Sequence, residues 1–323
     1  LPISLSVGIF CQREVSAKNI FVSPAGNGSD GSSWANAVQD PAKIDWTKVS
    51  AGDHIVLDGG TSSITYVTSV TVPVSNIVIR QSQEAGHSGQ VILRGAISRS
   101  LASGIGMTIT GSNVHVLAGR RSGILFSRYA AQALSVNGNN NVFRNLEFNE
   151  ITGYQPYGSG KVGGVTFGGS NNQFIACDFR DTTNGAVSTP VSDARNLAVF
   201  RNCTFGSSRY GYWGESGTAI QGSKSGSAAT VYVDSCVFGP FVNYGVDTGN
   251  DNMILSNSLF LAGGKANLRC APTAGRPSVM VSRCTLYDKK FLSGPGVVNV
   301  PYYGSPSALV SNGLGALRIR DSI

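Results

Sequence analysis

A group of polar residues late in the chain has the side-chain types needed to cleave an acidic polysaccharide by β-elimination. Lys265, Asn267 and Arg269 are spaced two residues apart, so in a β-strand they would share one face. Basic groups there could bind a uronate carboxylate, and Lys265 or Arg269 could remove the C5 proton. We therefore nominate Lys265 and Arg269 as catalytic residues. A surface ion pair between Asp247 and Arg269, with solvated neighbours, is the alternative interpretation.

A second group of candidates would bind the polymer rather than react with it. The segment from Arg209 to Glu215 carries three aromatic residues, which would stack on sugar rings if exposed and fill the interior if buried. The expected substrate-binding residues are Tyr210, Tyr212, Trp213, Glu215, Asn243, Asp247 and Asn267.

Hydrolysis would instead require two carboxylates that face each other at roughly 5–9.5 Å. Glu215, Asp247 and Asp251 could supply such a pair across neighbouring strands, although Asp251 lies in an Asn-rich turn where backbone capping is its usual role. The three histidines are scattered, and no Cys/His spacing typical of zinc occurs. We expect no cofactor and leave open only a calcium ion.

An internal repeat must position these residues. Each copy has a small residue, one variable residue and a large apolar residue, as in Cys177-Asp-Phe179 and Cys203-Thr-Phe205. Successive small positions are separated by 31, 26, 33, 22, 26 and 38 residues. A strict local motif with an irregular period is typical of a solenoid whose loops vary in length. The small positions are Leu146, Cys177, Cys203, Cys236, Ser258, Cys284 and Ser322.

Counting from these small positions aligns the candidate residues on successive copies. Tyr210, Asn243 and Lys265 each lie seven residues after the small position of their own copy. Asp247 and Arg269 each lie eleven residues after theirs. Asp247 and Arg269 should therefore be neighbours on adjacent strands.

Asn- and Gly-rich segments lead several copies, as in residues 137–141, 168–172 and 248–252. These residue types accept the positive φ of sharp corners. Stacked coils bury the apolar face that one coil cannot, and the spacing leaves no room for helices. The repeat predicts a single all-β domain, a parallel β-helix with variable loops. We expect its body at residues 75–323, after a lead-in and cap region at residues 18–74.

Four of the six cysteines occupy one repeat position. Cys177, Cys203, Cys236 and Cys284 should therefore form an internal stack, interleaved with Ser258. Strands stacked in register rarely give the torsion of a disulfide, so we expect reduced thiols. Cys11 and Cys270 are left without predicted partners.

The composition agrees with an extracellular all-β protein. Only 13% of the residues are charged and 41 are glycine, against about 25% charged in ordinary soluble proteins. A net charge of +7 favours polyanionic partners in general. The longest basic cluster is Lys289-Lys290, so nucleic acid is not an expected partner.

Residues 21–37 and 51–60 resemble the opening of many secreted right-handed parallel β-helix proteins of the pectate-lyase-like superfamily. The resemblance implies a right-handed β-helix and a sugar polymer as partner, and the net charge favours an acidic one. That superfamily includes polysaccharide lyases, glycoside hydrolases, tailspikes and adhesins, and fold alone does not deliver function. We expect a lyase that binds or cleaves the polymer, with a non-catalytic structural subunit or adhesin as the alternative.

The two ends of the sequence suggest export and assembly. Residues 1–17 are either signal-like or an N-terminal capping or assembly segment, and they are too short to span a membrane. We expect a secreted or cell-surface protein without a membrane span. Residues 316–323 alternate like an unpaired final strand, so end-to-end self-association into filaments is a further expectation.

Overall fold

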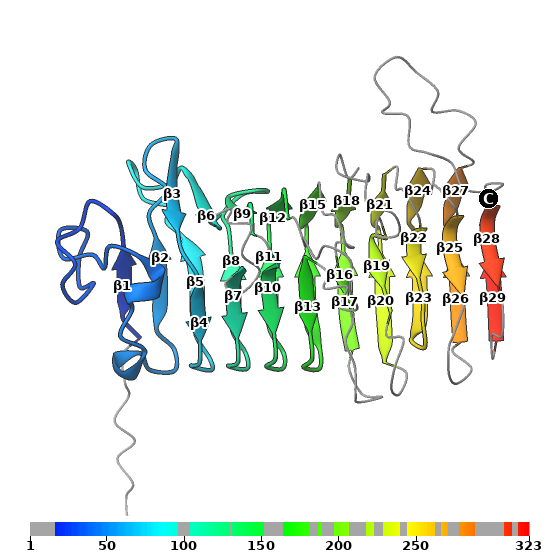
Figure 1. The fold of residues 1–323 in the computed structure, drawn as a ribbon, viewed down its shortest axis with the longest axis horizontal. Helices are drawn as coiled ribbons and strands as arrows, with labels where there is room; N and C mark the ends of the chain where they lie inside the picture. The colour runs from blue at the N-terminus through cyan, green and yellow to red at the C-terminus, as the bar shows by residue number, and fades with distance from the viewer. Residues whose placement is uncertain are drawn as a thin grey trace, which may run out of the picture.

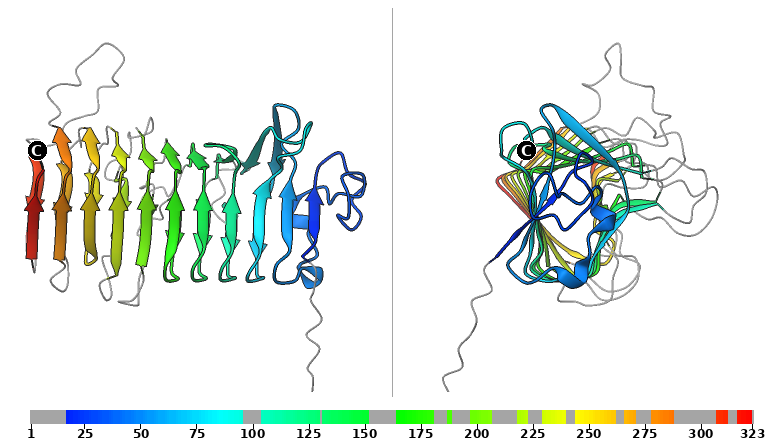
Figure 2. Two further views of the ribbon diagram at one scale, coloured as in Figure 1. Left: turned by 180° about the vertical axis from the view of Figure 1, so that it is seen from behind. Right: turned by 90° about the vertical axis from the view of Figure 1, so that its left-hand side faces the viewer.

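The computed structural model is an elongated stack of β-strands (Figure 1). It describes residues 17–95, 104–129, 131–151, 164–180, 187–188, 197–206, 218–222, 229–239, 244–261, 266–270, 278–287, 307–311 and 316–322. All strand pairs in this part of the chain are parallel, and they form three long sheets. Seen along the long axis, the strands of successive coils superpose (Figure 2).

Sheet A, as we name the first sheet, has 11 strands in the described residues. They are β1 (Asn19–Val22), β2 (His54–Leu57), β5 (Val78–Gln81), β8 (His115–Leu117), β11 (Val142–Arg144), β14 (Asn172–Ile175), β17 (Leu197–Arg201), β20 (Thr230–Asp234), β23 (Asn252–Ser256), β26 (Ser278–Ser282) and β29 (Ala316–Arg320).

Sheets B and C, as described, have nine strands each. Sheet B contains β3 (Ser63–Val67), β6 (Gln90–Arg94), β9 (Ile124–Ser127), β12 (Leu146–Asn149), β15 (Asp178–Arg180), β18 (Thr204–Phe205), β21 (Val237–Phe238), β24 (Leu259–Leu261) and β27 (Thr285–Tyr287). Sheet C contains β4 (Val70–Val72), β7 (Ile105–Ile109), β10 (Gln132–Val136), β13 (Val165–Phe167), β16 (Val187–Ser188), β19 (Ile220–Gln221), β22 (Tyr244–Asp247), β25 (Ala266–Cys270) and β28 (Ser307–Ser311).

From β2 onward the chain visits sheets A, B and C in turn and then starts the next coil. This order confirms the predicted parallel β-helix. Pairing already begins at β1 and β2, whose residues from Asn19 and His54 onward lie in register. The parallel sheet thus extends before residue 75, while the division of the chain into a cap region and a body stays a prediction.

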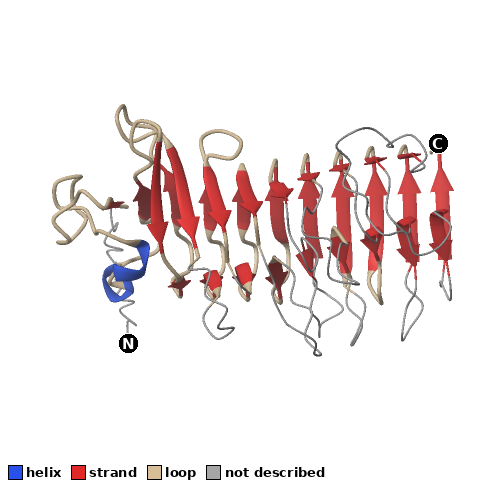
Figure 3. Cartoon of the chain, turned by 45° about the horizontal axis from the view of Figure 1, so that its top comes forward, coloured by secondary structure: helices blue, strands red, loops and turns tan. Residues whose placement is uncertain are grey.

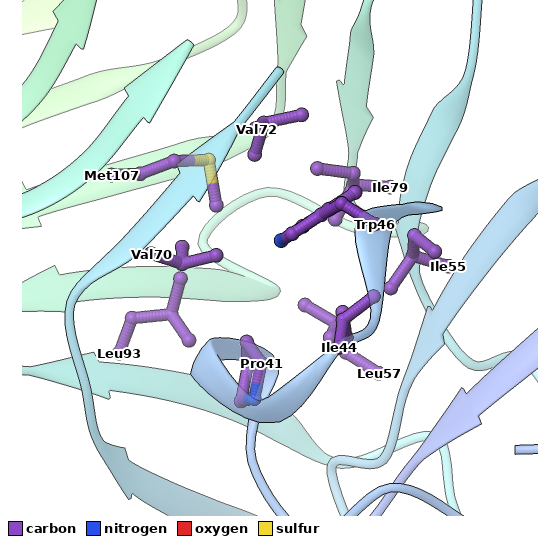
Figure 4. Close-up of a pocket in the computed structure, with 10 residues that line it drawn as sticks. All are labelled: Pro41, Ile44, Trp46, Ile55, Leu57, Val70, Val72, Ile79, Leu93 and Met107. Atoms are coloured by element: carbon purple, nitrogen blue, oxygen red, sulfur yellow. The ribbon is translucent and has the colours of Figure 1, made fainter. Parts of the chain in front are cut away.

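Two short 3-10 helices lie at the N-terminal end of the stack, η1 (Pro41–Lys43) and η2 (Trp46–Lys48) (Figure 3). Asp40 and Asp45 cap them by accepting hydrogen bonds from the backbone N–H groups of Ala42 and Thr47. Their apolar side chains line a small cavity of about 10 Å³ with inward residues of the first coils (Figure 4). The cavity is entirely apolar and has room for at most about one water, so η1 and η2 cover the core rather than form a ligand site.

The large apolar residue of each repeat copy forms a buried row under sheet B. The rings of Phe126, Phe148, Phe179, Phe205, Phe238 and Phe260 are stacked, with successive centroids 4.4 to 5.1 Å apart. Because strands pair about 4.8 Å apart, identical residues in register on adjacent coils fall at stacking distance. The repeat motif therefore supplies one continuous row of the core.

The corner between sheets A and B lies directly before the first residue of each motif. The residue before it has a positive φ, 60° at Asn145, 54° at Asn202 and 50° at Asn257. A left-handed residue turns the chain sharply, and asparagine tolerates it better than most residues. Ala176 and Arg283 adopt the same conformation, with φ of 53° and 51°, at some cost in strain.

The corner between sheets C and A carries the predicted asparagine turns. Asn140 and Asn171 both have a φ of 56°, and Asn171 Nδ2 donates to Asn140 Oδ1 at 2.8 Å. Beside them, buried Asn141 accepts from the Val114 N–H and buried Asn172 accepts from the Asn141 N–H. These asparagine side chains thus accept hydrogen bonds from backbone N–H groups that are buried at the corner.

The predicted cysteine stack is confirmed. Cys177, Cys203, Cys236 and Cys284 are buried and free, and the Cys236 N–H donates to Ser258 Oγ at 3.1 Å. Ser258 thus continues the stack between Cys236 and Cys284. Burial raises the pKa of the Cys177 and Cys284 thiols, which keeps them protonated. Cys11 and the side chain of Cys270 lie outside the described residues.

Candidate functional site on the outer face of sheet C

A row of polar residues runs along the outer face of sheet C. Each strand alternates, so that residues such as Leu134 and Val246 point into the core and the next residue points out. Backbone register joins the outward positions of successive coils into what we call the polar row. It consists of Thr71, Thr108, Ser135, Thr166, Gln221, Asp247 and Arg269, and the backbone of Ser188 continues the register between Thr166 and Gln221.

The polar row ends in an ion pair. Asp247 and Arg269 are register partners, and Arg269 Nη1 lies 3.5 Å from Asp247 Oδ2. The Arg269 guanidinium also lies 4.9 Å from the centre of the Tyr244 ring, a distance suited to a cation–π contact. The Asp247 side chain is 4% exposed, whereas that of Arg269 is 33% exposed. The ion pair of the alternative interpretation is therefore present, as a buried carboxylate beside a guanidinium that reaches solvent, and a catalytic role for Arg269 stays a prediction.

The turn that follows Asp247 is buried and rich in hydrogen bonds. Thr248, Asn250 and Asp251 are each at most 2% exposed, and Asp251 Oδ1 accepts from the Ala229 N–H at 2.9 Å. A Cβ added at Gly222 would lie 1.9 Å from the Thr248 carbonyl oxygen, so only glycine allows this approach. Asp251 caps backbone, the role its sequence context suggests.

This geometry gives the two ends of the pair different chemical capacities. Asp247 is shielded from solvent and next to a positive charge, so it orients Arg269. The remaining guanidinium N–H groups of Arg269 can donate to an anion that approaches along sheet C, because the planar fork matches a carboxylate.

The structure brings together only part of the predicted site. Asp247 and Arg269 lie side by side as expected, and the backbone of Asn267 is in β25 two residues before Arg269. The other predicted site residues lie outside the described part of the chain, namely Tyr210, Tyr212, Trp213, Glu215, Asn243 and Lys265.

The sequence analysis missed a polar cluster on sheet B. Arg121, from the loop between β8 and β9, donates to both carboxylate oxygens of Asp178 at 2.6 and 2.9 Å and to Thr204 Oγ1 at 2.6 Å. The hydrogen bonds that Arg121 donates to Asp178 raise the pKa of Arg121. Asp178 and Thr204 occupy the variable position of the repeat motif, so aligning that position would have revealed their side of the cluster.

Asp178 is only 3% exposed, and Arg121 donates to both of its carboxylate oxygens. The cluster therefore fixes the loop that carries Arg121 against sheet B. It does not present a carboxylate for catalysis.

Across the described ranges, no group of three or more His, Cys, Asp or Glu side chains could hold a metal ion. Dependence on calcium stays a prediction. In the same part of the chain, no helix is long and apolar enough to cross a membrane.

Known structures resemble this stack of parallel β-strands. No protein-family model and no curated protein matches the sequence. Among solved structures, pectate lyase Pel9A superposes with a TM-score of 0.63 at 17% identity, covering 94% of this chain and 80% of the lyase. The fold is a right-handed parallel β-helix. A rhamnogalacturonan lyase superposes with a TM-score of 0.53 at 12% identity, covering 93% of this chain and 84% of that protein.

Proposed function

We propose that this β-helix binds and cleaves an acidic polysaccharide that lies along the polar row of sheet C. The observation that carries the proposal is the buried Asp247 carboxylate holding a partly exposed guanidinium at 3.5 Å on that face. The similarity to a pectate lyase and a rhamnogalacturonan lyase supports a polysaccharide as the ligand. The net charge of +7 supports an acidic one.

Each described residue has a defined part in the proposed reaction. Arg269 binds the uronate carboxylate and withdraws charge, which acidifies the C5 proton. Asp247 orients Arg269 and receives no proton. The hydroxyl and amide groups of the polar row bind sugar hydroxyls over several coils.

The base in this proposal is Lys265, which shares the strand-face spacing of Arg269 in the sequence. It takes the C5 proton, the C4–O4 bond breaks, a C4=C5 double bond forms, and the departing oxygen takes a proton from water. Arg269 is a weaker candidate for this role, because an arginine guanidinium in a protein has donors and no free acceptor for a proton.

Unsaturated product absorbs ultraviolet light, and this absorbance provides the test. Purified protein is incubated with alginate, pectate and glycosaminoglycans, with and without calcium. We expect product from at least one polymer, and Lys265→Ala should lower turnover by about two orders of magnitude or more. Arg269→Lys, which keeps the charge but loses the fork, should raise KM more than it lowers kcat. The absence of product from every polymer would remove the lyase proposal.

The same assay decides the alternative, a non-catalytic structural subunit or adhesin. Such a protein would bind polymer without releasing product. Both functions place the chain outside the cell, where long polysaccharides occur, and detection of the protein in culture medium or on intact cells tests that location. Light scattering at rising concentration tests end-to-end self-association.

A further inference from the structure

An unbroken row of outward residues on sheet A alternates between arginine and aliphatic side chains. The register runs from Arg80 to Leu117, Arg144, Ile175 and Arg201 on five successive coils. We call these five positions the arginine row. They point outward because the residues before them, such as Val116, Phe143 and Phe200, are fully buried.

The charges of the arginine row are available to a ligand. Arg144 and Arg201 are exposed and Arg80 is half-buried. Within the described ranges, no carboxylate forms an ion pair with Arg80 or Arg144. Arg201 Nε lies 3.9 Å from Asp234 Oδ2, and both side chains are well exposed, at 57% and 32%. Solvent screens such a loose pair, so an incoming anion can compete for Arg201.

The neighbouring row provides a partly apolar floor. Val142, Gln173, Val199 and Tyr232 continue one another in register beside it, and Tyr232 is 39% exposed. Sugar rings have apolar C–H faces that pack against such side chains, and exposed tyrosine is a suitable stacking partner. The face therefore combines charge with surfaces that fit sugar rings.

The spacing of the charges points to one kind of polymer. Successive coils are about 4.8 Å apart, so arginines on alternate coils are about 9.6 Å apart. Two sugars of an extended chain cover a similar distance. A polymer that alternates a uronate with a neutral sugar would therefore place one carboxylate at each arginine and a neutral ring at Leu117 and Ile175.

We infer that the arginine row is a second polysaccharide-binding surface, specific for a linear polymer with one carboxylate per two sugars. It lies on a different sheet from the polar row and needs no catalysis, so it does not depend on the proposed function. A polyuronate, with a carboxylate on every sugar, would leave half of its charges opposite aliphatic residues.

The decisive variant exchanges two neighbours without changing composition or charge. Arg144→Ile with Ile175→Arg keeps three arginines but destroys their even spacing. Binding is measured by fluorescence anisotropy with end-labelled hyaluronan, polygalacturonate and single-stranded DNA oligomers. We expect the exchange to weaken hyaluronan binding about tenfold, since exposed contacts are individually weak but act together, and to leave polygalacturonate binding unchanged.

A charge-matched pair of triple variants provides the control. Arg80→Ser, Arg144→Ser and Arg201→Ser together should abolish most hyaluronan binding, whereas Lys43→Ser, Arg94→Ser and Arg120→Ser, which lie off the row, should not. Thermal unfolding verifies that each variant folds. Equal loss in both triple variants, or full binding by the exchange variant, would overturn the inference. DNA binding with the same dependence on the row would overturn the choice of polysaccharide.

Discussion

At the scale of single residues, Asp247 and Arg269 show what a repeat can predict about a site. Counting from the small motif position placed them on adjacent strands, and register confirms it. The count could not predict that Asp247 is buried and Arg269 is partly exposed. Burial depends on how the neighbouring turn folds over the strand, and that turn is specific to this coil. The positions of a site are thus set by the repeat, while its electrostatics are set locally.

Removing the guanidinium tests the buried carboxylate directly. Arg269→Met keeps most of the side-chain volume and removes the positive charge of Arg269 from beside Asp247. Loss of a fully buried partner costs about 3–5 kcal/mol, and we expect roughly 2 kcal/mol here because Arg269 is one third exposed. Urea denaturation measures the free energy of unfolding.

Two further variants show whether the buried carboxylate causes that loss of stability. Asp247→Asn combined with Arg269→Met should recover part of the loss, because the buried charge is gone. Arg144→Met, at an exposed arginine on sheet A, should change stability by less than about 0.5 kcal/mol. A cost for Arg269→Met no larger than that of Arg144→Met would mean that the carboxylate is compensated without Arg269.

At the scale of the coil, the left-handed corner residue is a repeated structural requirement that different residues satisfy unequally. Asn202 adopts it with little strain, whereas Ala176 does so with a φ of 53°. The conformation costs most L-residues about 1–2 kcal/mol, and asparagine less. The motif in the sequence revealed this corner through its small residue but did not reveal the backbone conformation before it, because alanine gives no signal for a positive φ.

Exchanging the corner residues gives a matched pair of predictions. Ala176→Asn should stabilise the protein by about 0.5–1 kcal/mol, and Asn202→Ala should destabilise it by a similar amount. Thermal unfolding of both variants measures the two shifts. Shifts of the same sign would show that side-chain contacts, rather than backbone strain, decide which residue these corners accept.

At the scale of the whole molecule, the fold could be predicted because one motif recurs on successive coils from Leu146 onward. Stacked phenylalanines from Phe126 to Phe260 form the interior, and the motif that spaces them is visible in the sequence. The first coils could not be placed in the same way. β1 and β2 lack the motif, and the segment between them contains η1 and η2. Their parallel pairing follows from the apolar alternation of Ile20 and Val22 against Ile55 and Leu57.

A solenoid also predicts how mutations combine over its length, since each coil contacts only its neighbours. Phe205 and Phe238 are stacked at 4.8 Å, whereas Phe126 and Phe260 lie five coils apart, about 24 Å. Each Phe→Ala substitution should cost about 3–5 kcal/mol. In double-mutant cycles by urea denaturation, Phe126→Ala and Phe260→Ala should add to within about 0.5 kcal/mol, and the stacked pair should deviate from additivity by more. Coupling of the distant pair as strong as that of the stacked pair would contradict nearest-neighbour stability, and with it the view that each coil presents its part of the polar row independently.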